Sequence, residues 1–225
     1  MKSSISKMLA LTVLAFVVIF INSSRKAKAA DKNLFVTEFK DVKHINKLVL
    51  IGNVDVYLTQ GTEENLKVYD NYYTKNALVQ WENGELRITS FDKTRLAVTI
   101  TVTNLSAIEA NGSVSVRTMN ELSTIDLDIH LKNNASAQIE AQAVNISSSL
   151  QDQSKLVLSG ESENQHLALN GTAEYEATRF TSPNRSMTIA DGAVASINQG
   201  GQATSIKTYS RVAEKENTLS FDLDF

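Results

Sequence analysis

Carboxylates and a histidine alternate along one short segment, at Asp126, Asp128 and His130. On a strand these side chains share one face, at about 7 Å per step. Carboxylate and imidazole groups are competent ligands for a divalent cation, so this patch is the candidate metal site of the sequence. The favoured alternative is a solvated strand face, because alternation by itself produces the pattern. The residues expected to face inward beside it are Ile125, Leu127 and Ile129.

A second pair of carboxylates, Glu174 and Glu176, flanks Tyr175. Paired carboxylates can serve as acid and base in a glycosidase, but alternation along a strand also explains this pair. Other chemistry is missing: there is no Cys, the three His are scattered, and Gly200-Gly201 lacks the Lys-Ser/Thr of a phosphate loop. The sequence therefore predicts no catalytic residue, no cofactor and no enzyme.

Four aromatic side chains could form a platform on which sugars stack, since amphipathic rings suit exposed binding faces. They are Tyr57, Tyr72, Tyr73 and Trp81. Packing in the core or in cross-strand pairs is the favoured alternative.

Alternation of apolar and polar residues is the main signal of secondary structure in this chain. Residues 96–103 alternate strictly, and the pattern recurs in 54–58, 125–131, 135–139 and 219–225. A period of two indicates half-buried strands. Beyond Ala29, no extended window carries a convincing helical stripe. The predicted class is all-β.

Turn-forming dipeptides recur along the second half of the chain, with separations of 22, 19, 18 and 21 residues. Asn, Asp and Gly tolerate the left-handed backbone that a sharp corner requires. A unit of about 20 residues is typical of one coil in a β-solenoid. A β-sandwich is the structural alternative, although its turns usually recur about every 8–12 residues. The dipeptides are Asn111-Gly112, Asn133-Asn134, Asp152-Gln153, Asn170-Gly171 and Asp191-Gly192.

The amino terminus has the three parts of a secretory signal peptide. Lys2 and Lys7 precede an apolar run at 8–21, and a small-x-small triplet follows at 27–29. The apolar run is shorter than the roughly 20 residues that span a bilayer, so we expect cleavage after Ala29. The alternative is an uncleaved anchor, because the region before the triplet is unusually basic.

The charge balance changes once this segment is set apart. Positions 1–29 hold five of the 22 cations and no acid, which leaves 17 cations against 25 acids, a net charge of −8. Nucleic acids require a basic footprint on their partner and are therefore excluded. The expected domains are a signal peptide at 1–29, a β-sheet portion at 30–103, and solenoid coils at 104–225 that end in a capping strand at 218–225.

Three segments resemble the putative auto-transporter adhesin head GIN domain family of exported bacterial proteins. They are residues 48–61, 83–88 and 105–116, of which 54–61 is the most distinctive part. The resemblance covers about residues 34–210 and implies one continuous domain that folds as a right-handed, β-helix-like stack. The family pattern places glycines at the corners, and this chain lacks them at Asn133-Asn134 and Asp152-Gln153.

Together these features predict an all-β, right-handed, single-stranded β-helix-like solenoid with a β-sheet N-terminal portion. The expected function is that of an exported, non-enzymatic adhesin or binding module in the periplasm, at the outer membrane or outside the cell. Its expected partner is a glycan or an envelope protein, with no membrane span after signal removal. A periplasmic scaffolding protein is the alternative, and a polysaccharide-active enzyme is the third hypothesis. The sequence leaves the oligomeric state open.

Overall fold

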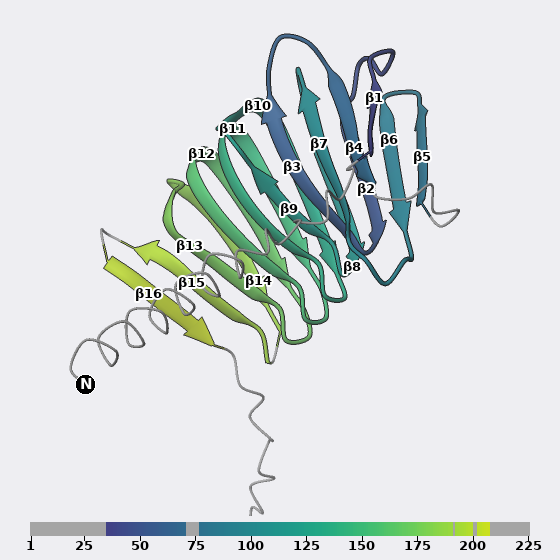
Figure 1. Cartoon of the computed structure of the whole chain (residues 1–225). Helices are drawn as coiled ribbons and strands as arrows, with labels where there is room; N and C mark the ends of the chain where they lie inside the picture. The colour runs from purple at the N-terminus through teal and green to yellow at the C-terminus, as the bar shows by residue number, and fades with distance from the viewer. Residues whose placement is uncertain (1–34, 71–76, 191, 200–201, 208–225) are drawn as a thin grey trace, which may run out of the picture. The chain divides into compact units, whose positions relative to one another are not determined.

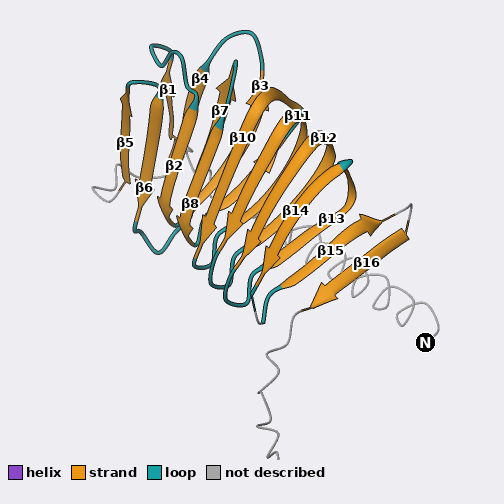
Figure 2. Ribbon diagram, turned by 180° about the vertical axis from the view of Figure 1, so that it is seen from behind, coloured by secondary structure: helices purple, strands orange, loops and turns teal. Residues whose placement is uncertain are grey.

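The computed structural model describes residues 35–70, 77–190, 192–199 and 202–207. They belong to the compact unit Leu34–Phe225 and form one sheet of sixteen strands, β1 to β16, without a helix among them (Figure 2). The all-β class is therefore confirmed. The predicted signal peptide and the predicted capping strand at 218–225 lie outside the described residues.

The sheet curls so that its strands form two ladders (Figure 1). The first ladder contains, in order, β1 (Phe35–Phe39), β4 (Asn65–Asp70), β7 (Leu96–Val102), β3 (Val54–Gln60), β9 (Ser115–Thr118), the first parts of β11 (Ser136–Leu150) and β12 (Lys155–Leu169), β13 (Glu174–Thr181), β15 (Val194–Gln199) and β16 (Gln202–Lys207). The second ladder contains β5 (Ala77–Glu82), β6 (Glu85–Ser90), β2 (Lys47–Gly52), β8 (Ala107–Gly112), β10 (Leu122–Lys132), the second parts of β11 and β12, and β14 (Asn184–Ile189).

Pairing within both ladders is parallel except at their ends. From β8 to β15, each strand pairs with the next strand of its own ladder along the chain, as in Ala107 with Asp128 and Ser136 with Lys155. Antiparallel pairing is confined to β1, β4, β5 and β16 and their partners among the described strands. The alternative of an antiparallel sandwich therefore fails over residues 107–197. A short local repeat sets the parallel register, as the spacing of the turn dipeptides predicts.

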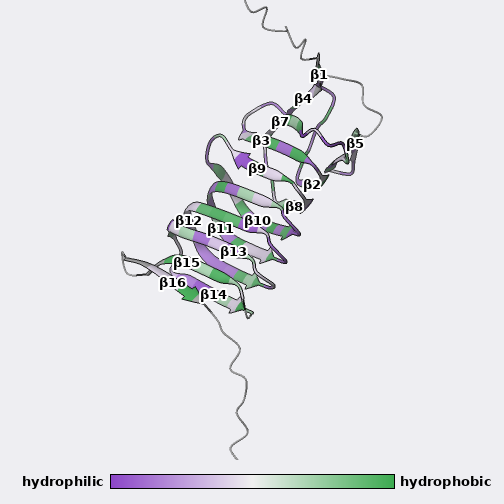
Figure 3. Ribbon diagram, turned by 60° about the horizontal axis from the view of Figure 1, so that its bottom comes forward, coloured by the Kyte–Doolittle hydropathy of each residue, from purple (hydrophilic) through white to green (hydrophobic). Residues whose placement is uncertain are grey.

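One hydrophobic cluster runs between the ladders from Val42 to Ile197. The predicted alternation is confirmed in β7, where every second residue is buried. Apolar and polar residues alternate along most strands in Figure 3. Among the residues that the structure describes, no helix is long and apolar enough to cross a membrane.

The prediction that Ile125 faces inward is wrong, because this side chain is 69% exposed. Ile125 and Asp126 are consecutive exposed residues in β10, so the alternation shifts by one position there. Val144, at the corresponding position of the neighbouring strand β11, is also exposed. Leu127 and Ile129 are fully buried, as expected.

The corners of the fold adopt the left-handed backbone that the dipeptides predict. Gly112 and Gly171 have φ values of 99° and 72°, and Asn133 and Asp152, which stand where glycine is missing, have 61° and 62°. Asn and Asp tolerate this region because their short side chains bond locally. Successive corners are also hydrogen bonded, since the amide of Gln153 donates to the Asn133 carbonyl at 3.0 Å. The corners without glycine therefore turn like the others.

Candidate functional site

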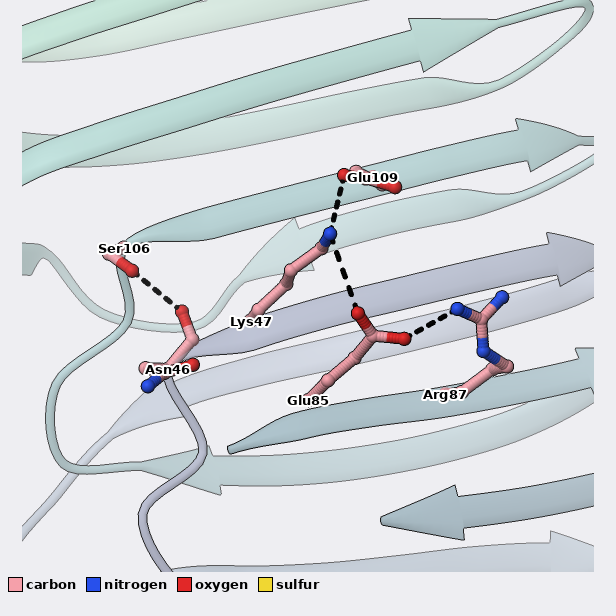
Figure 4. Close-up of polar contacts among 6 residues, drawn as sticks. All are labelled: Asn46, Lys47, Glu85, Arg87, Ser106 and Glu109. Carbon is pink, nitrogen blue, oxygen red and sulfur yellow. Dashed lines mark hydrogen bonds and ion pairs between the residues drawn. The ribbon is translucent and has the colours of Figure 1, made fainter. Parts of the chain in front are cut away.

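The outward face of the second ladder carries a line of alternating charges on three adjacent strands. Lys47 of β2 stands in register with Glu85 of β6, and its Nζ lies 3.4 Å from Glu85 Oε2 and 2.8 Å from Glu109 Oε1 on β8. Arg87 Nη2 contacts Glu85 Oε1 at 2.5 Å on the other side. We call these four residues the charged cluster (Figure 4). Parallel register builds it, because strands distant in sequence bring their outward positions side by side.

Each charge of the cluster stabilises its neighbours. The hydrogen bond to Glu109 raises the pKa of Lys47 above its ordinary value, against the opposing effect of burial. Burial acts to raise the pKa of Glu85, but the hydrogen bond and charge of Arg87, together with Lys47, outweigh it and lower that pKa. Both shifts favour the charged forms of Lys47 and Glu85, so the contacts of the cluster are ion pairs between neighbouring strands.

A shallow groove with a volume of about 290 Å³ lies beside the cluster, at the carboxyl ends of the second-ladder strands. Val49 is only 5% exposed although its position is outward, since Arg87 and Glu109 flank it in register. We call this depression the second-ladder groove. Its lining combines cationic, imidazole, amide and apolar side chains, including those of Ile51, Arg87, Asn111, His130, Lys132 and Gln151.

The predicted metal patch lies next to this groove and is exposed along β10. Asp126 is already engaged, because Asn145 Nδ2 donates to its Oδ1 at 2.7 Å. Asn164 donates in turn to Asn145 at 2.9 Å. The Asp126 carboxylate therefore lies at the end of a hydrogen-bonded row of asparagine side chains. Within the described ranges, no group of three or more acidic or His side chains converges on a metal position. Of the three predicted residues, only His130 lines the groove.

The second carboxylate pair lies on the first ladder, away from the groove. Glu174 and Glu176 are exposed on either side of the buried Tyr175, as the alternation predicts. Glu174 Oε2 lies 3.0 Å from the Nζ of Lys155, which stands in register on β12. Glu176 instead stands beside Val157 and Ser196. The two carboxylates are therefore part of an ordinary polar strand surface.

The predicted aromatic platform is not assembled by the residues that are described. Tyr57 is 41% exposed on β3 of the first ladder, whereas Trp81 is 43% exposed on β5 at an end of the second. Tyr72 and Tyr73 lie outside the described residues. Tyr57 and Trp81 thus belong to different ladders and cannot hold one ligand as a pair.

Sequence reasoning did not single out Lys47, Arg87 and Glu109, because they are distant from one another in the chain. The signal that would have found them is their common strand position. Each is the first or the third residue of a strand of the second ladder. Parallel pairing sets Arg87 and Glu109 on either side of Val49, and Lys47 lies at the adjacent outward position of the same strand as Val49.

Comparison with known proteins agrees with this architecture. The sequence matches the family described as putative auto-transporter adhesin, head GIN domain, over residues 44–211. The chain belongs to this family. The resemblance carried by residues 48–61, 83–88 and 105–116 is therefore confirmed, and the chain contains a head GIN domain. Among curated proteins, no match is found.

Solved structures share the fold of this head GIN domain. A putative adhesin from Bacteroides fragilis aligns with a TM-score of 0.65 at 24% identity, covering 73% of this chain and 78% of its own. A putative adhesin from Parabacteroides distasonis aligns with a TM-score of 0.63 at 13% identity, covering 72% and 81%. A putative lipid binding protein from the same species has a TM-score of 0.60 at 16% identity, with the same coverage. At these identities the likeness concerns the fold alone.

Proposed function

We propose that this protein is an exported, non-enzymatic binding module of the cell envelope or surface, with a glycan or an envelope protein as its partner. The observation that carries the proposal is the second-ladder groove, which offers charged, amide and apolar groups together on a rigid sheet. Sites built on regular strands hold their side chains in fixed positions, which favours binding. Family membership supports the same role, because the family is described as putative adhesins.

The lining of the groove favours a polar ligand over a lipid. One structural relative is described as a putative lipid binding protein, and lipid sites are mostly apolar. Here Arg87, His130 and Lys132 line the groove beside Ile51. A ligand with charged or hydroxyl groups suits this composition better than an acyl chain.

Export is proposed from the predicted signal peptide at 1–29 and from the description of the family. We expect fractionation to recover the chain in the periplasm, the outer membrane or the medium, with an intact mass that corresponds to cleavage after Ala29. Recovery in the cytoplasm at full mass would contradict export.

Binding is tested by applying the chain, purified from the cells that produce it, to a glycan array and to envelope extracts. We expect retention of a glycan or of one envelope component, and no turnover of acidic or neutral polysaccharides. If the chain retains no ligand in either experiment, the proposed binding function is wrong. Turnover that is lost in Glu174→Gln would replace it with the enzyme hypothesis.

We further propose that the parallel coils wind as a right-handed β-solenoid. The support is the register in which Ser136 pairs with Lys155, so that positions 136–154 make up one coil. Deletion of 136–154 removes this whole coil and keeps the register, so the variant should still unfold cooperatively. Deletion of 136–145 breaks the register and should prevent folding. Equal damage from both deletions would contradict a modular stack.

A further inference from the structure

We infer that the second-ladder groove recognises a single uronic-acid unit of a glycan, an inference that rests on the proposed binding function. Such a unit has one carboxylate, several hydroxyls and an apolar ring face. The groove offers a matching group for each of these three features.

The carboxylate is matched by two cations on opposite sides of the groove. Arg87 lies on β6 and Lys132 on β10, three strand spacings or about 14 Å apart across the strands. Lys132 is also two residues further along its strand than His130, which shares the register row of Arg87. Both side chains line the same depression, so they approach it from opposite sides. Lys132 is exposed and has no ion pair among the described residues. The guanidinium of Arg87 has five donors, and Glu85 engages one end of it.

The negative charge in the lining of the groove is already compensated. Glu109 lines the groove, but its Oε1 lies 2.8 Å from Lys47 Nζ. Glu109 is paired with Lys47, and Arg87 forms an ion pair with Glu85. Lys132 therefore supplies an uncompensated positive charge. An anion that enters the groove therefore finds an excess of positive charge there, although the chain beyond Ala29 has a net charge of −8, from 17 cations and 25 acids.

The hydroxyls and the ring face of a sugar find their own partners. Asn111, Ser149 and Gln151 supply amide and hydroxyl groups that can both donate and accept hydrogen bonds. Ile51, which is partly exposed, supplies the apolar surface on which a ring face can pack. This mixture distinguishes an acidic sugar from inorganic phosphate, which has no apolar face.

Acidic residues around the groove limit the number of charges that the ligand can carry. Asp126 and Asp128 lie on the same strand, six and four residues before Lys132, and both are exposed. Like charges that face each other across an interface disfavour binding. The inferred ligand therefore has an isolated or terminal uronate and is not a continuous polyuronate.

Titration with methyl glucuronide and with methyl glucoside, followed by NMR, tests the inference. We expect the glucuronide to bind at least about tenfold more tightly than the glucoside, since hydrogen bonds to a charged carboxylate are stronger than those to a neutral hydroxyl. Lys132→Gln should remove most of this preference, and Lys132→Arg should retain it. Lys155→Gln, at an exposed lysine on the other ladder, is the matched control and should bind like the wild type.

The two proposals fail in different ways. If the chain retains glycans on the array but binds both sugars equally, or if Lys132→Gln and Lys155→Gln weaken the glucuronide alike, the uronate site is wrong and the binding function stands. If neither the array, the extracts nor the two sugars give binding, both proposals fall. Circular dichroism of each variant verifies that the fold is retained.

Discussion

A buried tyrosine should make the stability of this protein depend on alkaline pH in a way that one substitution removes. Tyr175 is 1% exposed, and the amide of Gln165, itself 3% exposed, donates a hydrogen bond to its hydroxyl oxygen. Arg185 Nε donates in turn to Gln165 Oε1 at 2.6 Å. Burial raises the pKa of Tyr175 well above its ordinary value, despite the lowering effects of Gln165 and of the charge on Arg185.

The sign of the effect follows from this raised pKa. Above pH 10 the unfolded chain loses the Tyr175 proton while the folded chain keeps it, so the unfolded state gains stability. The free energy of unfolding should fall by about 1.4 kcal/mol for each pH unit above about 10, until the pKa of the folded state is reached. Below pH 10 this contribution is fully present.

Tyr175→Phe changes the free energy of unfolding both near neutral pH and at alkaline pH. Near neutral pH the variant leaves the Gln165 amide without its acceptor, which should cost about 1–3 kcal/mol. The variant has no hydroxyl to ionise, so its deficit relative to the wild type should shrink by about 1.4 kcal/mol between pH 9 and pH 11. Other groups that titrate in this range cancel in the difference between the two proteins.

Urea unfolding followed by circular dichroism at pH 8 to 11 measures this difference. Tyr57→Phe, at a tyrosine that is 41% exposed, controls for the loss of a hydroxyl as such. A gap between wild type and Tyr175→Phe that stays constant from pH 8 to pH 11 would refute the reasoning. It would mean that the hydroxyl reaches water before the protein unfolds.

Three further substitutions test the fold and the strand surfaces by urea unfolding. Gly160→Ala should cost more than about 3 kcal/mol, because a Cβ there would lie 2.1 Å from the Ala141 carbonyl oxygen at a φ of +105°; a cost below about 1 kcal/mol would show that the bend relaxes freely. Leu158→Ala should cost about 2–5 kcal/mol, since Leu158 is 1% exposed in the core, and a neutral result would contradict tight packing between the ladders. Glu174→Gln should change stability by less than about 1 kcal/mol, because its ion pair with Lys155 is exposed, and a larger loss would reveal a structural role for the pair.

Strand class and corner positions could be predicted because both depend on local chemistry. A period of two buries one face of a strand, and Asn, Asp or Gly marks a left-handed corner, as Asn133 and Asp152 confirm. The outward orientation of Ile125 could not be predicted in this way. Its apolar side chain continues the alternating pattern, but the bend of β10 shifts the phase by one residue and turns it outward. Where the alternation breaks depends on the path of the neighbouring strands and not on Ile125 itself.

Local sequence is sufficient to establish that this chain forms strands, where it turns, and to which family it belongs. These properties follow from side-chain periodicity, from backbone preferences at single residues and from motifs within one segment. Which outward side chains become neighbours depends instead on the pairing of strands in the folded protein. Lys47 meets Glu85 because parallel register pairs the two residues, and it meets Glu109 diagonally, because Glu109 is in register with Val49, two residues further along β2. The sequence between these residues does not indicate either contact. The groove beside them can therefore be identified only from the folded structure.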